Sequence, residues 1–262
     1  MCVTPRLTEF SLPDSFPFMN YPDSNFELPE PDRPQAVFEI IMASGIVSSF
    51  LVAMVFTSIF GRNSLTLTEM DVGFFMKFQM TESAVTFLIL WMLMKLRGET
   101  FSGLGLCRKQ WKTNVLLGTL AAPCLIVVSG IAGAVFQFFL PEYALEKNPL
   151  MDMIHSSRQL ALFIFVTIVC GGIKEELQRA FILRRFRYHL GGTVVGLVVW
   201  SLVFGAGHYA QGAPGICVAV ILGFVFGVLY LMRGNLVLPI TAHSVYNTMA
   251  LLIYWFTVGI NK

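Results

Sequence analysis

The sequence predicts an all-α fold, a polytopic transmembrane helix bundle of about seven spans, because its apolar residues gather into runs of membrane-crossing length. Apolar residues make up 55% of the chain and charged residues only 13%, roughly half the charged share of an ordinary soluble domain. The charged residues fall mainly between the runs and at their ends. The net charge of +2 gives no reason to expect a nucleic-acid partner, and the basic residues cluster beside apolar runs instead.

The apolar runs define the expected helices in chain order. They cover residues 36–60, 74–96, 114–140, 159–183, 192–208, 216–232 and 236–258. The second run is the least regular, because Lys77 and Glu82 interrupt it. The sixth contains Gly223 and Gly227, whose four-residue spacing allows two membrane helices to pack closely.

The chain divides into three expected parts. Residues 1–35 contain seven of the twelve prolines and six acidic residues against two arginines, a composition that predicts a flexible, polar tail. Two transmembrane helices are expected over residues 36–100. Residues 101–260 then hold the remaining spans and all of the candidate catalytic residues.

The distribution of basic residues predicts the orientation of the bundle. One side of a seven-span chain would carry Lys95, Arg97, Arg108, Lys109, Lys112, Arg184, Arg185, Arg187 and Arg233. The other side would carry Arg62, Lys147, Arg158 and Lys262. Because loops rich in Lys and Arg stay in the cytoplasm, we expect a cytoplasmic N-terminus, an extracytoplasmic C-terminus and a bacterial plasma membrane around the bundle.

An acidic pair with a nearby arginine follows the apolar part of the fourth run. On a helix, Arg179 lies four residues after Glu175 and three after Glu176, so either carboxylate can pair with it. Charges at this depth are costly unless they are paired or face water. We expect one Glu to be held structurally by Arg179 while the other, left without a cation, acts as a general base. A charge cluster at the membrane boundary is the alternative.

Two histidines lie in later runs. His208 follows Gly205-Ala-Gly207, so a second helix or a substrate can approach it, and Phe204 lies one turn away. His243 and Asn247 lie one turn apart, where an imidazole and an amide can bind an oxyanion, orient water or hold a metal. Packed, hydrogen-bonded interior groups are the alternative for both. Straight-helix counting places Glu175 and His208 at different depths.

Taken in order, these motifs resemble the CPBP family of intramembrane proteases, which includes CAAX-type and bacteriocin-processing members. The matching residues are Glu175-Glu176 with Arg179, then Phe204 to His208, then His243 to Asn247. The resemblance covers about residues 100–255 and departs from the family in one respect. Family members usually place the arginine five residues after the first glutamate. Alignment on the Glu pair makes Glu175 the base, whereas alignment on Arg179 places Lys174 there.

The resemblance implies an intramembrane endopeptidase that acts on a membrane-associated peptide or a lipidated protein within the lipid bilayer. Glu175 and His208 would activate water, Glu176 would pair with Arg179, and His243 with Asn247 would stabilise an oxyanion. A zinc ion held by Glu175, His208 and His243 is the metalloprotease alternative, although no His-Glu-x-x-His motif is present. A proton-coupled transporter and a non-catalytic immunity or scaffold protein are the other functions compatible with these charges.

Overall fold

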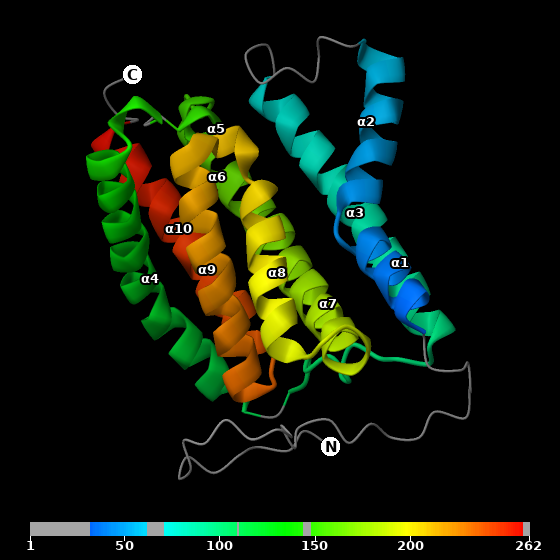
Figure 1. Cartoon of the computed structure of the whole chain (residues 1–262). Coiled ribbons are helices and arrows are strands. Elements are labelled where there is room, and N and C mark those ends of the chain that lie inside the picture. Colours follow the sequence, from blue (N-terminus) through cyan, green and yellow to red (C-terminus); the bar gives the residue numbers. More distant parts are fainter. Residues whose placement is uncertain (1–31, 62–70, 109, 144–147, 259–262) are drawn as a thin grey trace.

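The computed structural model describes residues 32–61, 71–108, 110–143 and 148–258, and every regular element among them is a helix (Figure 1). The predicted all-α class is therefore confirmed for the described part of the chain. Most of the predicted tail, residues 1–31, lies outside the described residues. The division into tail, helix pair and core stays a prediction.

The helices follow the predicted runs closely. Before the site they are α1 (Arg33–Ala43), α2 (Ile46–Phe60), α3 (Val72–Leu96), α4 (Trp111–Phe139), the short η2 (Pro141–Tyr143) and α5 (Pro149–Asp152). The remaining elements are α6 (Ser157–Thr167), η3 (Ile168–Glu175), α7 (Glu176–His189), α8 (Thr193–Ala206), η4 (Tyr209–Gln211), α9 (Gly212–Arg233) and α10 (Val237–Thr257). Each of the predicted runs thus contains helix.

The expected number of spans is not confirmed. By length and composition, two described helices can cross a membrane: α4, and the stretch Tyr209–Arg233 that contains α9. A third is added if α1 and α2, bent by 43°, form one broken span. Two of the other helices are less suited to crossing a membrane for physical reasons. Helix α3 carries the charged Lys77 and Glu82, and α8 has only 14 residues.

The first predicted run is broken at Gly45 rather than straight. Gly45 has a φ of 90°, a conformation that favours glycine, and it separates α1 from α2. The amide of Gln178 in α7 donates a 2.7 Å hydrogen bond to the carbonyl of Ala43 at the end of α1. The break is therefore satisfied by a polar group from the core, as a buried helix end requires.

The fourth predicted run is longer than expected and resolves the question of depth. Elements α6, η3 and α7 follow one another without a gap from Ser157 to His189, so Glu175 lies near the middle of this long helical stretch. Element α8 is short and ends at Ala206, just before His208. The early end of α8 and the extension of α7 allow Glu175 and His208 to reach the same cavity.

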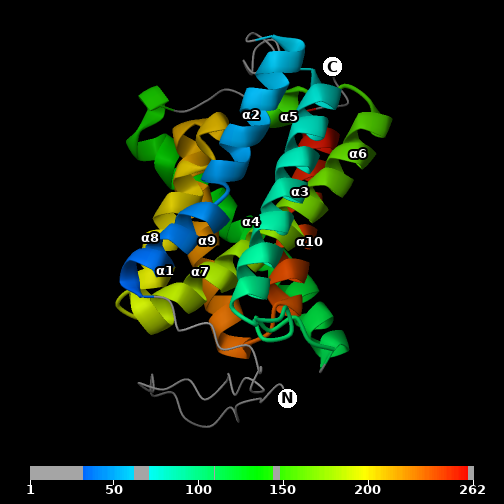
Figure 2. The same cartoon turned by 90° about the vertical axis from the view of Figure 1, so that its right-hand side faces the viewer.

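The core is a bundle in which α8 and α9 pack closely and α10 lies between α4 and η3 (Figures 1 and 2). A Cβ atom on Gly223 would come within 2.8 Å of the Phe204 ring, so this glycine allows α9 to approach α8. Gly227 faces Leu197 of α8 in the same way. The glycine spacing predicted to serve helix packing does so.

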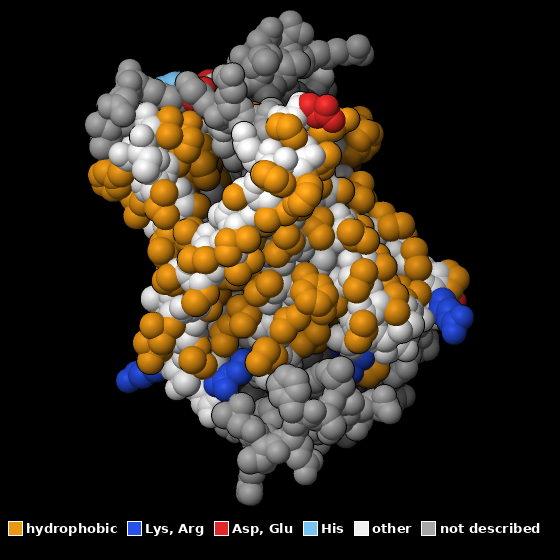
Figure 3. All heavy atoms as spheres, turned by 60° about the vertical axis from the view of Figure 1, so that its left-hand side comes forward, with side chains coloured by type: hydrophobic (Ala, Val, Ile, Leu, Met, Phe, Trp, Pro, Cys, Tyr) orange, Lys and Arg blue, Asp and Glu red, His pale blue; other side chains and the backbone are white. Residues whose placement is uncertain are grey.

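Basic residues gather at one end of the bundle, where they also bind acidic partners. Arg185 is buried and donates to Glu39 at 2.5 Å and to Glu99 at 2.8 and 3.1 Å. Arg97 contacts the same Glu39 at 2.6 Å. Figure 3 shows Lys and Arg at one end of the visible face, below a broad band of hydrophobic side chains. Ion pairs here tie α1 and the end of α3 to α7.

Replacing Glu39 with Gln should lower the thermal stability of the purified protein in detergent. The change leaves the buried Arg185 and the partly exposed Arg97 without the carboxylate they share. We expect a loss of about 3 kcal/mol in stability, the lower part of the range for broken buried pairs, because Arg185 keeps Glu99. Glu142→Gln, at an exposed position of η2, is the control. Equal melting temperatures for the two variants would contradict a stabilising role for this network.

Candidate active site

The site is built around a π-helical stretch, η3, inserted between α6 and α7. Its wider turn contains Gly171 and Gly172, which face α10. A Cβ on Gly171 would lie 2.6 Å from Asn247 Nδ2, and one on Gly172 would lie 3.1 Å from Ser244 Cβ. The two glycines therefore let α10 approach closely enough to bring His243 and Asn247 beside Glu175. Short π-helical stretches are frequent at functional sites.

Glu176 forms the buried centre of the site. Its carboxylate is fully buried, makes an ion pair with Arg179 and bonds to His243 Nδ1 at 2.8 Å. Of the two pairings that the sequence allows, the structure thus has the one between Glu176 and Arg179, three residues apart. Because an ionised carboxylate can only accept hydrogen bonds, His243 Nδ1 carries the proton of this bond. The other ring nitrogen, Nε2, lies on the side of Glu175.

Aromatic rings enclose this charged pair. The guanidinium carbon of Arg179 lies 4.8 Å from the centre of the Phe204 ring and 5.6 Å from that of Phe226, close enough for cation–π attraction. Phe226 also stacks on the imidazole of His243, with ring centres 4.3 Å apart and planes 15° apart. The rings of α8 and α9 thereby fix the positions of both Arg179 and His243.

Glu175 differs from its neighbour in exposure and in partners. Its side chain is 21% exposed, and Oε2 lies 3.8 Å from His243 Nε2. Among the described residues, this oxygen has no hydrogen-bond partner. Adjacent glutamates in the sequence therefore have different environments, one locked by Arg179 and the other open to a cavity.

His208 and Asn247 reach the same cavity from two further elements. His208 Nδ1 bonds at 2.8 Å to the carbonyl oxygen of Phe204, which can only accept, so its Nε2 is left as an acceptor in the neutral ring. The rings of Phe204 and His208 are 4.6 Å apart. The amide of Asn247 lies against Gly171. The structure thus gathers Glu175, His208, His243 and Asn247 around one space.

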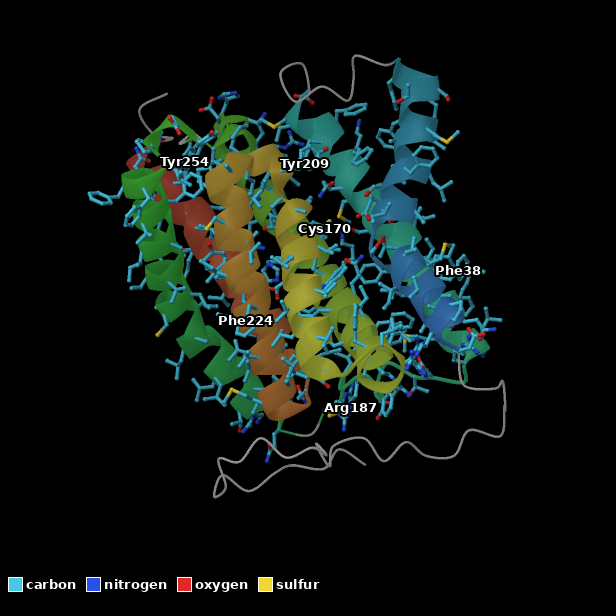
Figure 4. The ribbon with its side chains drawn as sticks, viewed as in Figure 1. Phe38, Cys170, Arg187, Tyr209, Phe224 and Tyr254 are labelled. Carbon is cyan, nitrogen blue, oxygen red and sulfur yellow. The ribbon has the colours of Figure 1, made fainter. Side chains whose placement is uncertain are left out.

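That space is a cavity of about 190 Å³. Its described lining comprises Phe75, Gln79, Asn148, Leu150, Met151, Phe163, Val166, Thr167, Cys170, Gly171, Glu175, His208, Gln211, His243, Tyr246, Asn247, Ala250 and Leu251. Figure 4 shows Cys170 inside the bundle, between the ends marked by Tyr209 and Arg187. Among these lining residues Glu175 is the acidic one, so the cavity combines one carboxylate with two imidazoles and several amides.

A second buried cluster, missed at the level of sequence, supports η3 from the other side. Lys174 Nζ contacts Glu82 Oε2 at 2.8 Å, and Ser48 and Thr86 donate to the other oxygen of Glu82 at 2.7 and 2.8 Å. The cluster joins α2 and α3 to the residue preceding Glu175. The available signal was a pair of opposite charges, Glu82 and Lys174, in two different apolar runs.

The arrangement does not fit the zinc site considered from the sequence. In the part of the chain that the structure describes, no three or more His, Cys, Asp and Glu side chains lie close enough to hold a metal ion. Glu175 and His243 approach each other, but His208 does not join them as a third ligand. His243 Nδ1 is hydrogen-bonded to Glu176.

Comparison with known proteins agrees with the motifs. Residues 157–249 match the family of Rce1-like type II CAAX prenyl endopeptidases, so the resemblance to CAAX-type proteases is confirmed for this segment, which includes every predicted site residue. Together with the apolar helices that are long enough to cross a membrane, the match points to an integral membrane protein.

One curated relative is similar in sequence, and its printed name gives no activity. The uncharacterised protein YpbD of Bacillus subtilis (strain 168) is 26% identical over 118 residues, 44% of this chain and 57% of YpbD. The chain thus spans little more than half the length of that relative. No solved structure matches the chain.

Substitutions of the two glutamates should differ in their effect on stability. Glu176→Gln leaves Arg179 buried without its counter-charge and weakens the bond to His243, so we expect a loss of roughly 3–5 kcal/mol. Glu175→Gln, at a partly exposed site without a cationic partner in contact, should change the melting temperature little. Thermal unfolding of both variants in detergent tests the difference. Equal losses would mean that the two carboxylates share the structural role.

Proposed function

We propose that the protein is an intramembrane endopeptidase that hydrolyses a peptide bond of a membrane-associated substrate with a glutamate-activated water. The observation that carries this proposal is the contrast between the two glutamates. Glu176 is neutralised by Arg179 and fully buried, whereas Glu175 faces the cavity beside His243 and shares it with His208 and Asn247. A carboxylate without a cation in contact, partly removed from water, is suited to act as a base.

The proposed reaction begins with a water molecule held in the cavity by Glu175 and the open nitrogen of His208. Glu175 accepts a proton from this water as its oxygen attacks the carbonyl carbon of the scissile bond. The negative charge that develops on the carbonyl oxygen is met by the amide N–H of Asn247, and by His243 Nε2 when the ring carries its second proton. The carbon–nitrogen bond then breaks, and Glu175 returns its proton to the leaving amine.

Glu176 and Arg179 contribute by holding His243 rather than by touching the substrate. The bond from His243 Nδ1 to Glu176 and the stacked ring of Phe226 fix the orientation of the imidazole. Arg179 keeps Glu176 ionised, so that it remains an acceptor for Nδ1. This arrangement of a reactive group, an imidazole and a buried carboxylate that orients it follows a general logic of hydrolytic sites.

Removing the proposed base gives the direct test. Purified Glu175→Gln should fold as the parent chain does and lose turnover by at least about 10²-fold, the low end for general-base catalysis. The assay measures cleavage of lipidated and signal-type peptides in detergent by mass spectrometry. Unchanged turnover in Glu175→Gln would refute this role, and absence of any cleavage by the parent chain would favour a scaffold or immunity function.

A second test acts on Asn247 without replacing it. In Gly171→Ala the new methyl group would lie 2.6 Å from Asn247 Nδ2, so the amide at the end of this side chain must move away. We expect a loss of turnover of about 10²-fold, as for removal of one oxyanion donor, with the fold retained. Gly130→Ala in α4, where a Cβ meets nothing within 4 Å, is the matched control. Equal activity of both variants would remove Asn247 from the mechanism.

Metal dependence is tested separately. With Glu175, His208 and His243 acting as base and hydrogen-bonding groups, turnover should persist after treatment with a chelator, and elemental analysis of the active protein should find less than one zinc per chain. Activity that is lost on chelation and restored by zinc would overturn this part of the proposal, because a structural or catalytic zinc would then be required.

A further inference from the structure

Four buried polar side chains from three elements meet beside the residue that precedes Glu175. They are Lys174 of η3, Ser48 of α2, and Glu82 and Thr86 of α3. One carboxylate oxygen of Glu82, Oε2, binds Lys174 Nζ at 2.8 Å. The hydroxyls of Ser48 and Thr86 lie 2.7 and 2.8 Å from the other oxygen. Both oxygens of Glu82 are therefore occupied, and the carboxylate has a fixed position.

Stability alone gives a weak reason for burying Lys174 with Glu82. Replacing a buried ion pair by apolar residues of similar volume is often neutral or stabilising. What distinguishes this pair is its place in the chain, because Lys174 directly precedes the proposed base. One turn further along, Gln178 donates a 2.7 Å hydrogen bond to the carbonyl of Ala43. Residues before and after Glu175 are thus both tied to the N-terminal helices.

The turn that the ion pair holds is the π-helical one. Such turns are rare compared with α-helical turns, so contacts from other elements must hold η3 in this form. Loss of its extra residue would rotate α6 against α7 by about 100°, the angle between successive residues of an α-helix. The pair of Glu176 with Arg179 holds the start of α7, and the pair of Lys174 with Glu82 holds the end of η3. Glu175 lies between these two anchors.

From these observations we infer that Glu82 is a positioning residue for Glu175 and acts through Lys174. It fixes the residue before the base, and it occupies an ammonium group that would otherwise be free to neutralise the base. The inference rests on the proposed function for the role of Glu175. Glu82 and Ser48 lie outside the segment 157–249 that matches the protease family, so helices beyond that segment contribute to the reaction by orienting its base.

Removal of both charges tests this role without leaving one of them unpaired. In the double variant Glu82→Met with Lys174→Met, the melting temperature in detergent should stay close to that of the parent chain. We expect kcat for the peptide that the parent cleaves fastest to fall by about 10²-fold, as for a misplaced reacting group. The KM should not change, because neither residue belongs to the described lining of the cavity.

Two further variants separate positioning from a purely structural role. Glu39→Gln breaks the other polar cluster that joins the N-terminal helices to α7, and it should lower the melting temperature while kcat, measured below the unfolding transition, is retained. Lys174→Arg keeps the positive charge and should retain most of the turnover that the double variant loses. Unchanged kcat in the double variant, or an equal loss in Glu39→Gln, would overturn the inference.

A milder variant serves if the double variant does not fold. Thr86→Val removes one hydroxyl from Oε1 of Glu82 at nearly constant shape. We expect a smaller loss of kcat in the same direction, again with KM unchanged. Full turnover in Thr86→Val would then contradict the positioning role.

The position of Glu175 can also be measured without a substrate. Glu175 Oε2 lies 3.8 Å from His243 Nε2, so the nitrogen NMR signal of His243, assigned by its absence from His243→Gln, should change in Glu175→Gln. We expect this signal to change in the double variant and to stay in place in Glu39→Gln, and an unchanged signal in the double variant would overturn the inference. If the parent chain cleaves no peptide, the proposed function fails, while the NMR signal still decides whether Glu82 positions Glu175.

Discussion

The interaction on which the rest of the site depends is the buried ion pair between Glu176 and Arg179. Two charges in this interior are costly unless each is well paired, and here the pair also receives the imidazole of His243 and lies against the rings of Phe204 and Phe226. One interaction therefore fixes α7 against α8, α9 and α10. Because Glu176 forms the ion pair with Arg179, the neighbouring Glu175 is left to face the cavity.

The π-helical element η3 gives the two adjacent glutamates their different surroundings. A π-helical turn holds more residues than an α-helical turn and so changes the direction of the side chains that follow it. In this chain Arg179 pairs with Glu176, three residues before it. An alignment on the arginine would instead place the second glutamate of the pair four residues before Arg179, at Glu175. The wider turn immediately before Glu175 accompanies that shortened spacing. Gly171 and Gly172 in the same turn admit α10.

Two polar clusters outside the cavity attach the N-terminal helices to this core. Glu82 with Lys174, Ser48 and Thr86 joins α2 and α3 to η3, while Glu39 with Arg97 and Arg185 joins α1 and α3 to α7. In an apolar environment such groups cannot separate without exposing unpaired charge. They therefore specify how the N-terminal helices sit, although the exposed apolar residues of α2 contribute little packing to the core.

The sequence alone determined the helical class, the approximate position of each long helix and four of the residues that line the cavity, Glu175, His208, His243 and Asn247. It did so because long apolar runs with charged residues inside them are compatible with few structures other than a membrane bundle with a polar interior. It could not determine which glutamate pairs with Arg179, since spacings of three and four residues are equally good on a helix. Nor could it find the break at Gly45, the π-helical turn or the partner of Lys174. Those features arise from contacts between helices far apart in the chain, and only the tertiary structure decides them.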